Sequence, residues 1–199
     1  MCMYLCLDRF PGQVERVLAD SKPDVVVFAA KETPAAAAEL SIEKDPCSNA
    51  AGKVVSAAAA RGAWTLYISC DSVYCASAAP ATPITPDTPT SPHASDKAGW
   101  YKALSERAVL AAGGEDVGIL RVPRLVGPLE KIGESEVTVL AKLVFPRVKA
   151  GERVDDRTLR QTAHVRQVAN ICVALAEIRT KTRAPLRGIW HYQVCLIYY

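Results

Sequence analysis

A thiol beside a carboxylate is the first candidate for chemistry in this chain. Cys70 and Asp71 follow the apolar run Trp64 to Ser69. A thiolate is a strong nucleophile, but a neighbouring carboxylate raises the thiol pKa and keeps the sulfur protonated. No histidine stands close by in the sequence to take that proton. The pattern therefore favours a buried, inert thiol over a reactive one.

His164 is the second candidate. It stands directly before a stretch with apolar residues at helical spacing, which predicts a helix that begins at this residue. A histidine in this place either acts as a general base or caps and packs against the start of the helix. We favour the capping and packing role.

Apolar runs that alternate with helical patterns predict the elements that position these side chains. The run Val25 to Ala30 is continuous and apolar, which is typical of a strand buried on both faces of a parallel sheet. The pattern predicts strands over residues 25–30, 64–69, 117–122 and 188–192, and helices over 11–21, 48–61, 96–112, 135–144 and 164–178. Strands that alternate with helices predict an α/β fold with a mostly parallel sheet flanked by helices.

A proline-rich loop over residues 76–95 interrupts this alternation. Its prolines recur every three residues, the period of a polyproline II helix, at Pro80, Pro83, Pro86, Pro89 and Pro92. Four of them follow a hydroxyl side chain, at Thr82, Thr85, Thr88 and Ser91. We interpret the segment as a solvated loop insertion. The alternative is a partner site at residues 80–92, either for a proline-recognising domain or for a phosphorylating enzyme.

Composition narrows the class of protein. The chain has 199 residues, of which half are hydrophobic, which fits one domain with a sizeable core. Its net charge of +3 is too small to indicate nucleic acid as a partner. The run at residues 25–30 is too short to span a membrane, and no export signal is visible. The seven cysteines are therefore read as reduced thiols in a cytoplasmic protein.

Three stretches resemble the extended short-chain dehydrogenase/reductase superfamily. Residues 23–30 are similar to the strand that passes beneath the nicotinamide cofactor, and residues 67–74 to the strand that ends in Ser-Ser/Thr-Asp-Tyr-Val-Phe. Residues 120–127 are similar to the Leu-Arg-x-x-x-x-Tyr-Gly strand and loop. Together they resemble dTDP-4-dehydrorhamnose reductases. The resemblance implies a Rossmann-like NAD(P)-binding domain over residues 1–199, with part of the substrate-binding lobe at about 128–165.

A narrower resemblance is to the regulatory (beta) subunits of methionine adenosyltransferase. It rests on residues 127–140, 162–169, 175–179 and 187–191, and the stretch from Glu130 to Leu140 is the most specific of them. It implies a reductase-like protein that binds the catalytic subunit of methionine adenosyltransferase and modulates the synthesis of S-adenosylmethionine.

The catalytic positions that the superfamily resemblance implies are altered. A short-chain reductase uses a Tyr as proton donor and a Lys four residues later; Lys102 takes the Lys position, and Ala98 the Tyr position. Tyr101 is adjacent to Lys102, so it would point roughly 100° away around the helix. Cys70 takes the place of the hydroxyl that polarises the substrate carbonyl, and a thiol is the weaker donor. These changes predict a catalytically silent protein.

The cofactor site that the resemblance implies is also incomplete. NADP or NAD would contact Leu7, Asp8, Phe28, Ala29, Ala30, Lys102 and Leu125. The family holds the pyrophosphate on a Gly-x-x-Gly-x-x-Gly turn, whereas this chain has Gly12 alone before Gly52. Residues 1–8 align with the family's third strand, so we expect the first βαβ unit to be missing. Glu32 would repel the 2′-phosphate of NADP.

Three hypotheses follow. The first is a truncated, catalytically silent regulatory subunit of methionine adenosyltransferase, and the second is an NAD(P)H-dependent nucleotide-sugar reductase that uses Tyr101. The third is an interaction protein that acts through its proline-rich loop. Without its family neighbours, the strand at residues 25–30 would expose an edge, which predicts marginal stability or self-association.

Overall fold

A parallel sheet of four strands organises the computed structural model of the chain, which describes residues 12–30, 50–74, 87–90, 97–129 and 162–192. The strand order is β1-β2-β3-β6, and every neighbouring pair is parallel. The strands are β1 (Val25–Phe28), β2 (Trp64–Cys70), β3 (Val117–Val122) and β6 (Gly188–His191). The predicted α/β class is therefore confirmed, with each strand within two residues of its expected bounds.

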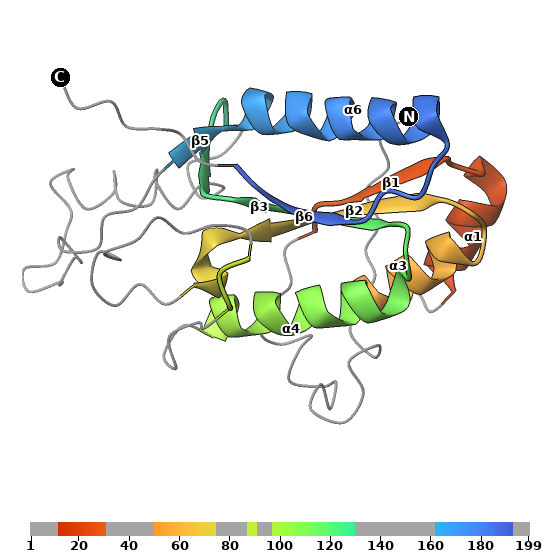
Figure 1. Ribbon diagram of the computed structural model, residues 1–199, viewed down its shortest axis with the longest axis horizontal. Coiled ribbons are helices and arrows are strands. Elements are labelled where there is room, and N and C mark those ends of the chain that lie inside the picture. Colours follow the sequence, from red (N-terminus) through yellow and green to blue (C-terminus); the bar gives the residue numbers. More distant parts are fainter. Residues whose placement is uncertain (1–11, 31–49, 75–86, 91–96, 130–161, 193–199) are drawn as a thin grey trace, which may run out of the picture.

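Helices cover both faces of the sheet. On one face lie α1 (Gln13–Ser21), α3 (Ala50–Ala59) and α4 (Lys97–Ala112), and on the other lies α6 (Val165–Thr182) (Figure 1). Side chains alternate along β2: Tyr67 joins the cluster under α3 and α4, whereas Trp64 and Leu66 join the cluster under α6. All six residues of β3 are buried, because β3 lies inside the sheet with helices on both faces.

Two small elements lie near the carboxyl ends of these strands. A short 3-10 helix, η2 (Asp71–Val73), follows β2 directly, and β4 (Arg124–Val126) pairs in parallel with β5 (Thr162–His164). The sequence pattern did not predict this second sheet. His164 ends β5 and caps α6, where its Nδ1 accepts a hydrogen bond of 3.2 Å from the Arg166 backbone N–H. The predicted capping role of His164 is confirmed.

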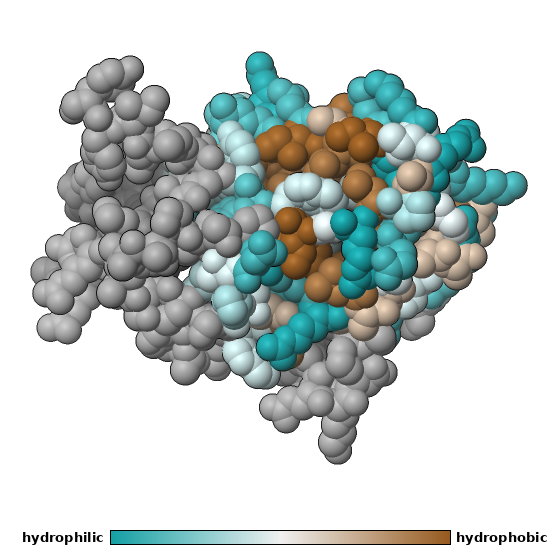
Figure 2. All heavy atoms as spheres, viewed as in Figure 1, coloured by the Kyte–Doolittle hydropathy of each residue, from teal (hydrophilic) through white to brown (hydrophobic). Residues whose placement is uncertain are grey.

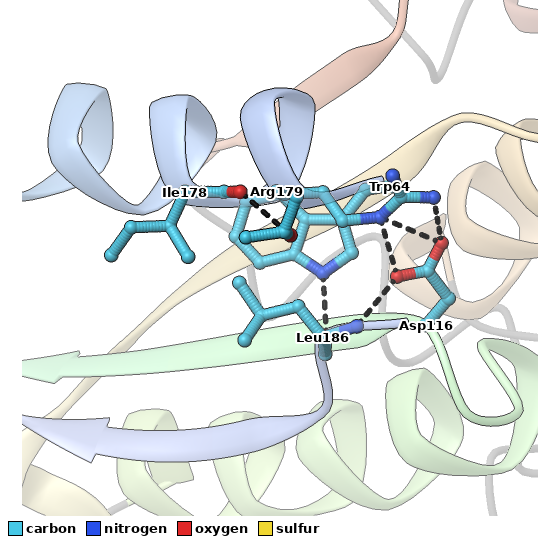
Figure 3. Close-up of polar contacts among 6 residues, drawn as sticks. Trp64, Asp116, Ile178, Arg179 and Leu186 are labelled. Carbon is cyan, nitrogen blue, oxygen red and sulfur yellow. Dashed lines mark hydrogen bonds and ion pairs between the residues drawn. The ribbon is translucent and has the colours of Figure 1, made fainter. Parts of the chain in front are cut away.

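A polar cluster fixes the connection between α6 and β6 (Figure 3). The Asp116 carboxylate accepts hydrogen bonds from the Arg179 guanidinium of α6, the shortest at 2.6 Å, and from the Leu186 backbone N–H at 3.0 Å. The Trp64 indole N–H donates to the Leu186 carbonyl at 2.8 Å. Because both backbone groups of Leu186 are bonded, this connection is tied to the start of β2 and to the turn before β3.

The surface of α6 is not wholly polar. In the face that Figure 2 shows, apolar side chains gather over α6 and β6, and Ile178 of α6 is 48% exposed. Within the part of the chain that the structure describes, no helix is long and apolar enough to cross a membrane. The predicted helix at 135–144 and most of the proline-rich loop and substrate lobe lie outside the described residues.

Candidate functional site

The carboxyl ends of β1, β2 and β3 meet at one edge of the sheet, because the three strands are parallel neighbours. In open parallel sheets, ligands bind outside this edge. Ala29 and Ala30 follow β1 and are exposed, η2 follows β2, and Leu125 of β4 is 37% exposed just after β3. The structure therefore brings the ends of the predicted site elements together, whereas Leu7 and Asp8 lie outside the described residues.

Lys102 of α4 reaches toward β2. Its ammonium donates hydrogen bonds to the Tyr67 hydroxyl at 3.0 Å and to the Ile68 carbonyl at 3.1 Å. The same nitrogen lies 4.6 Å from the centre of the Tyr67 ring, a cation–π contact. The sequence left two roles open, a ribose ligand or a solvated helical lysine. The structure shows a third role, in which hydrogen bonds from Lys102 join α4 to β2.

The positions that the resemblance assigns to the catalytic Tyr and Lys, Ala98 and Lys102, both lie in α4. α4 is continuous from Lys97 to Ala112, so Ala98 and Lys102 are four residues apart on one helix face. Tyr101 points about 100° away from Lys102. Its ring makes an edge contact with Trp100, and its carbonyl accepts a hydrogen bond from the Ser105 hydroxyl at 2.9 Å. Tyr101 is therefore not presented beside Lys102 as a proton donor would be.

Cys70 is a deactivated thiol. Burial raises its pKa most strongly; the Ser72 hydrogen bond and the Lys102 charge act in the opposite direction without reversing the shift. Its sulfur lies 2.7 Å from the Ser72 hydroxyl oxygen, and either atom can be the donor. A raised pKa leaves the sulfur protonated at neutral pH, where it is a poor nucleophile. The direction of this shift supports the expected inert thiol, although Cys70 is only partly buried.

A buried ion pair lies behind the site. Arg121 of β3 and Glu106 of α4 make two parallel hydrogen bonds, at 3.0 and 2.8 Å, and both side chains are 4% exposed. The same guanidinium donates to the hydroxyl of Tyr74, which ends the η2 turn. Since Glu106 follows Lys102 by one helical turn, the ion pair also sets the position from which Lys102 reaches Tyr67.

His191 extends this cluster to β6. It pairs with Arg121 across the sheet, and its ring stacks on Tyr74 with centroids 5.7 Å apart. Burial first, and then the charge of Arg121, lower the pKa of His191. The neutral imidazole of His191 packs on the Tyr74 ring. The cluster therefore joins β3, α4, η2 and β6 through structural contacts.

The described residues do not form the nicotinamide site that the resemblance implies. Phe28 is turned into the core, where its ring stacks on Tyr67 at 5.8 Å. Gly12 adopts φ +81 before α1, a left-handed conformation that favours glycine at a turn. Lys102 is engaged by Tyr67 and Ile68.

A metal centre finds no support in the described part of the chain. Among these residues no group of three or more His, Cys, Asp or Glu side chains lies close enough to hold an ion.

Sequence reasoning missed the residues that hold this site together, which are Tyr67, Tyr74, Glu106, Arg121 and His191. One signal was available: Arg121 stands inside the apolar run 117–122, and a charged residue in a buried strand requires a buried partner. The sequence does not reveal which acidic residue that partner is.

Comparison with known proteins identifies the family. The model of the RmlD substrate binding domain matches residues 9–195, which is nearly the whole chain. The chain therefore belongs to this family, and its likeness to dTDP-4-dehydrorhamnose reductases is confirmed.

Individual relatives agree with the resemblance to beta subunits of methionine adenosyltransferase. The chain is 32% identical to "Methionine adenosyltransferase 2 subunit beta" of Rattus norvegicus over 95% of its own length and 51% of the relative's. The subunit of the same name from Xenopus laevis is 31% identical over 90% of this chain and 52% of the relative. The chain thus spans about half the length of the curated relatives it matches.

Solved structures confirm the fold. A hypothetical dTDP-4-dehydrorhamnose reductase from Sulfolobus tokodaii superposes with a TM-score of 0.66 at 22% identity, covering 96% of this chain and 62% of that one. The NADP complex of dTDP-4-dehydrorhamnose reductase from Bacillus anthracis superposes with a TM-score of 0.60 at 19% identity, covering 92% of this chain and 60% of that one. MoeE5 in complex with UDP-glucose and NAD superposes with a TM-score of 0.67 at 19% identity, covering 96% of this chain and 62% of that one. Structural neighbours of this fold thus bind nicotinamide cofactors.

Proposed function

We propose that the chain is a reductase-like regulatory component of methionine adenosyltransferase, which binds the catalytic subunit and modulates S-adenosylmethionine synthesis. The observation that carries the proposal is the similarity of 95% of the chain to subunits of that name at 32% identity. It acts in the cytoplasm, where reduced cysteines are expected.

We further propose that the chain is catalytically silent as a reductase. Support comes from α4, where Ala98 occupies the tyrosine position and Lys102 is bonded to Tyr67 and Ile68 of β2. Cys70, with its raised pKa, is a weak donor in the place of the carbonyl-polarising hydroxyl. The remaining family contacts for NADP or NAD are too few, in this proposal, to hold the cofactor in a reactive position.

Association is the experiment that tests the regulatory proposal. The tagged chain and the catalytic subunit of methionine adenosyltransferase would be mixed at micromolar concentrations and passed over a size-exclusion column. We expect co-elution in one peak, while an unrelated Rossmann-fold protein used as a control elutes separately. Separate elution of the two proteins at these concentrations would sink the proposal.

A second candidate function is an NAD(P)H-dependent nucleotide-sugar reductase, which the family match favours. It requires Tyr101 as the proton donor. Oxidation of NADPH or NADH in the presence of a 4-keto sugar nucleotide, abolished in Tyr101→Phe but retained in Trp100→Phe, would establish it. We expect no oxidation above the rate without protein.

The proline-rich loop stays a separate proposal, with a proline-recognising or phosphorylating partner at residues 80–92. Asp87 to Thr90 are its described residues, and Asp87 and Pro89 are exposed there. A map of phosphorylated sites that shows all four hydroxyl residues unmodified in the cellular protein would contradict the phosphorylation hypothesis.

A further inference from the structure

His191, the last residue of β6, stacks on an aromatic ring that already carries a cation. Its imidazole lies on the Tyr74 ring with centroids 5.7 Å apart and planes 22° apart. The guanidinium carbon of Arg121 lies 5.0 Å from the centre of the same ring, and the guanidinium donates a hydrogen bond to the Tyr74 hydroxyl. Tyr74 therefore contacts a permanent cation and a group that becomes a cation in mildly acidic solution.

The carboxylate that balances Arg121 is committed to it. Both Glu106 oxygens accept hydrogen bonds from the Arg121 guanidinium, at 3.0 and 2.8 Å, and both side chains are 4% exposed. Within the described part of the chain, no carboxylate makes an ion pair with His191. A proton taken up by His191 thus places a second positive charge beside Arg121 without bringing a negative one, which is unfavourable in a half-buried place.

The charged and titratable groups around this stack come from four elements. β3 supplies Arg121, α4 supplies Glu106, η2 ends at Tyr74, and the described stretch of the proline-rich loop supplies Asp87. Burial raises the pKa of Tyr74 most strongly, and the charges of Glu106 and Asp87 act in the same direction. For His191, burial first and then the charge of Arg121 lower the pKa, so neither carboxylate reverses the effect of the guanidinium.

Two backbone hydrogen bonds close the elements that meet at the stack. The Tyr192 N–H, directly after His191, donates to the Arg121 carbonyl at 2.9 Å and fixes the end of β6 on β3. The Tyr74 N–H donates to the Asp71 carbonyl at 3.1 Å and closes the η2 turn. Because β6 has only four residues, its end opens locally at a smaller free-energy cost than the whole sheet.

We propose that His191 is a pH-sensitive joint, whose imidazole leaves the Tyr74 ring when it takes up a proton and releases the end of β6 from β3 and from the η2 turn. The stability that the stack contributes is complete above the ordinary histidine pKa of about 6.5, and it is lost as the pH falls from there through the lower folded-state value. The joint lies within the chain, so it does not depend on the proposed regulatory function.

An NMR titration of the 199-residue chain with labelled histidine and tyrosine rings, from about pH 8 to about pH 4.5, tests the joint. We expect the His191 ring to titrate with a midpoint below about 6.5, and the Tyr74 ring signals to shift with the same midpoint. The protection of the Tyr192 amide against hydrogen exchange should fall over the same range. By linkage, that loss is about tenfold for each unit by which the His191 midpoint lies below 6.5.

Two variants separate the proton on His191 from other effects of acid. His191→Phe keeps an aromatic ring on Tyr74 but takes up no proton, so we expect neither the Tyr74 shift nor the loss of Tyr192 protection. The matched control His164→Gln alters the cap of α6 and should retain both. The amide of Ile119 reports whether each variant folds, because β3 is fully buried.

Three results would overturn the proposal. They are a His191 midpoint at or above about 6.5, Tyr74 and Tyr192 signals that do not respond when His191 titrates, and a pH response that persists unchanged in His191→Phe. The first two are measured in the unaltered chain, so they decide the question even if His191→Phe does not fold.

Discussion

At the scale of single residues, the guanidinium of Arg121 does most to hold the candidate site in place. It joins β3 to Glu106 of α4 and to Tyr74 at the end of η2, and it lies across the sheet from His191. Such a group is stabilising only while its partners are present, because an unpaired buried charge has lost its water without compensation. Arg121 and Glu106 therefore stabilise the structure through their pairing.

The first prediction concerns this ion pair. We expect Glu106→Leu to lower the free energy of unfolding by roughly 3–5 kcal/mol, since it leaves the Arg121 charge buried without its carboxylate. The double variant Glu106→Leu/Arg121→Met should recover most of that loss, because it removes both charges. Urea denaturation measures the two free energies. A double variant no more stable than the single one would show that the charges do not act as a pair.

At the scale of elements, the close packing of β3 depends on a glycine. A Cβ added at Gly118 would lie 2.6 Å from the Trp190 ring and 2.8 Å from the Trp64 ring, both of which cover this position on the α6 face. The two indoles cross the strand here because no side chain stands between them and the backbone. The indoles of Trp64 in β2 and Trp190 in β6 thus pack directly on the backbone of β3 at Gly118.

We predict that Gly118→Ala destabilises the protein by about 1–3 kcal/mol, the usual cost of overpacking a close-packed core. The thermal unfolding midpoint should fall, and the near-ultraviolet circular dichroism of the tryptophans should change with it. The paired variant Gly118→Ala/Trp190→Phe, which makes room for the methyl group, should recover part of the loss. An unchanged midpoint in Gly118→Ala would contradict the packing described.

The ion pair between Arg179 of α6 and Asp116, in the turn before β3, predicts that the stability of the protein depends on pH. Burial acts to raise the pKa of Asp116, but the hydrogen bonds from Arg179 and Leu186 and the charge of Arg179 outweigh it and lower the pKa. A carboxylate with a lowered folded-state pKa contributes stability above its unfolded pKa of about 3.9, and that contribution is lost as the pH falls through the folded value.

We therefore expect Arg179→Met to be less stable than the unaltered chain by about 1–2 kcal/mol at pH 6. The difference should begin to shrink as the pH falls below about 4, the ordinary pKa of an aspartate, and should be lost once the pH passes the lower folded-state pKa of Asp116. Urea denaturation at several pH values measures it, with Lys181→Met as a control for loss of an exposed ion pair, Lys181–Glu177. A difference that stays constant down to pH 2 would rule out Asp116 as the partner responsible.

The sequence predicted these elements better than their contacts, for a physical reason. Runs such as Val117–Val122 report burial directly, so the strands and helices follow from local pattern. The partners of Lys102 and Arg121 depend on which strands become neighbours, and that information is not local. The pairing of β4 with β5 joins residues 124–126 to 162–164, and two strands of three residues leave almost no periodic signal. The capping role of His164 was predictable, because it involves the next turn of the same chain.

At the scale of the whole molecule, the fold is that of a reductase, but the described residues do not assemble the reactive groups of one. Lys102 is bonded to β2 and Phe28 is packed in the core, and we propose that Ala98 occupies the tyrosine position. The chain shares sequence over nearly its whole length with proteins named as beta subunits of methionine adenosyltransferase 2. A regulatory function needs a stable surface and no reactive site, which agrees with a scaffold held by buried structural contacts.

We propose that this chain acts on a methionine adenosyltransferase. The most direct test of this proposal is the initial rate of S-adenosylmethionine formation by the catalytic subunit, measured while the chain is added up to a tenfold excess, with Gly118→Ala as a destabilised comparison. We predict a saturable change in the rate or in the KM for methionine, reaching its limit near a fixed ratio of the two proteins. A rate and a KM that stay constant across the whole titration would contradict the account.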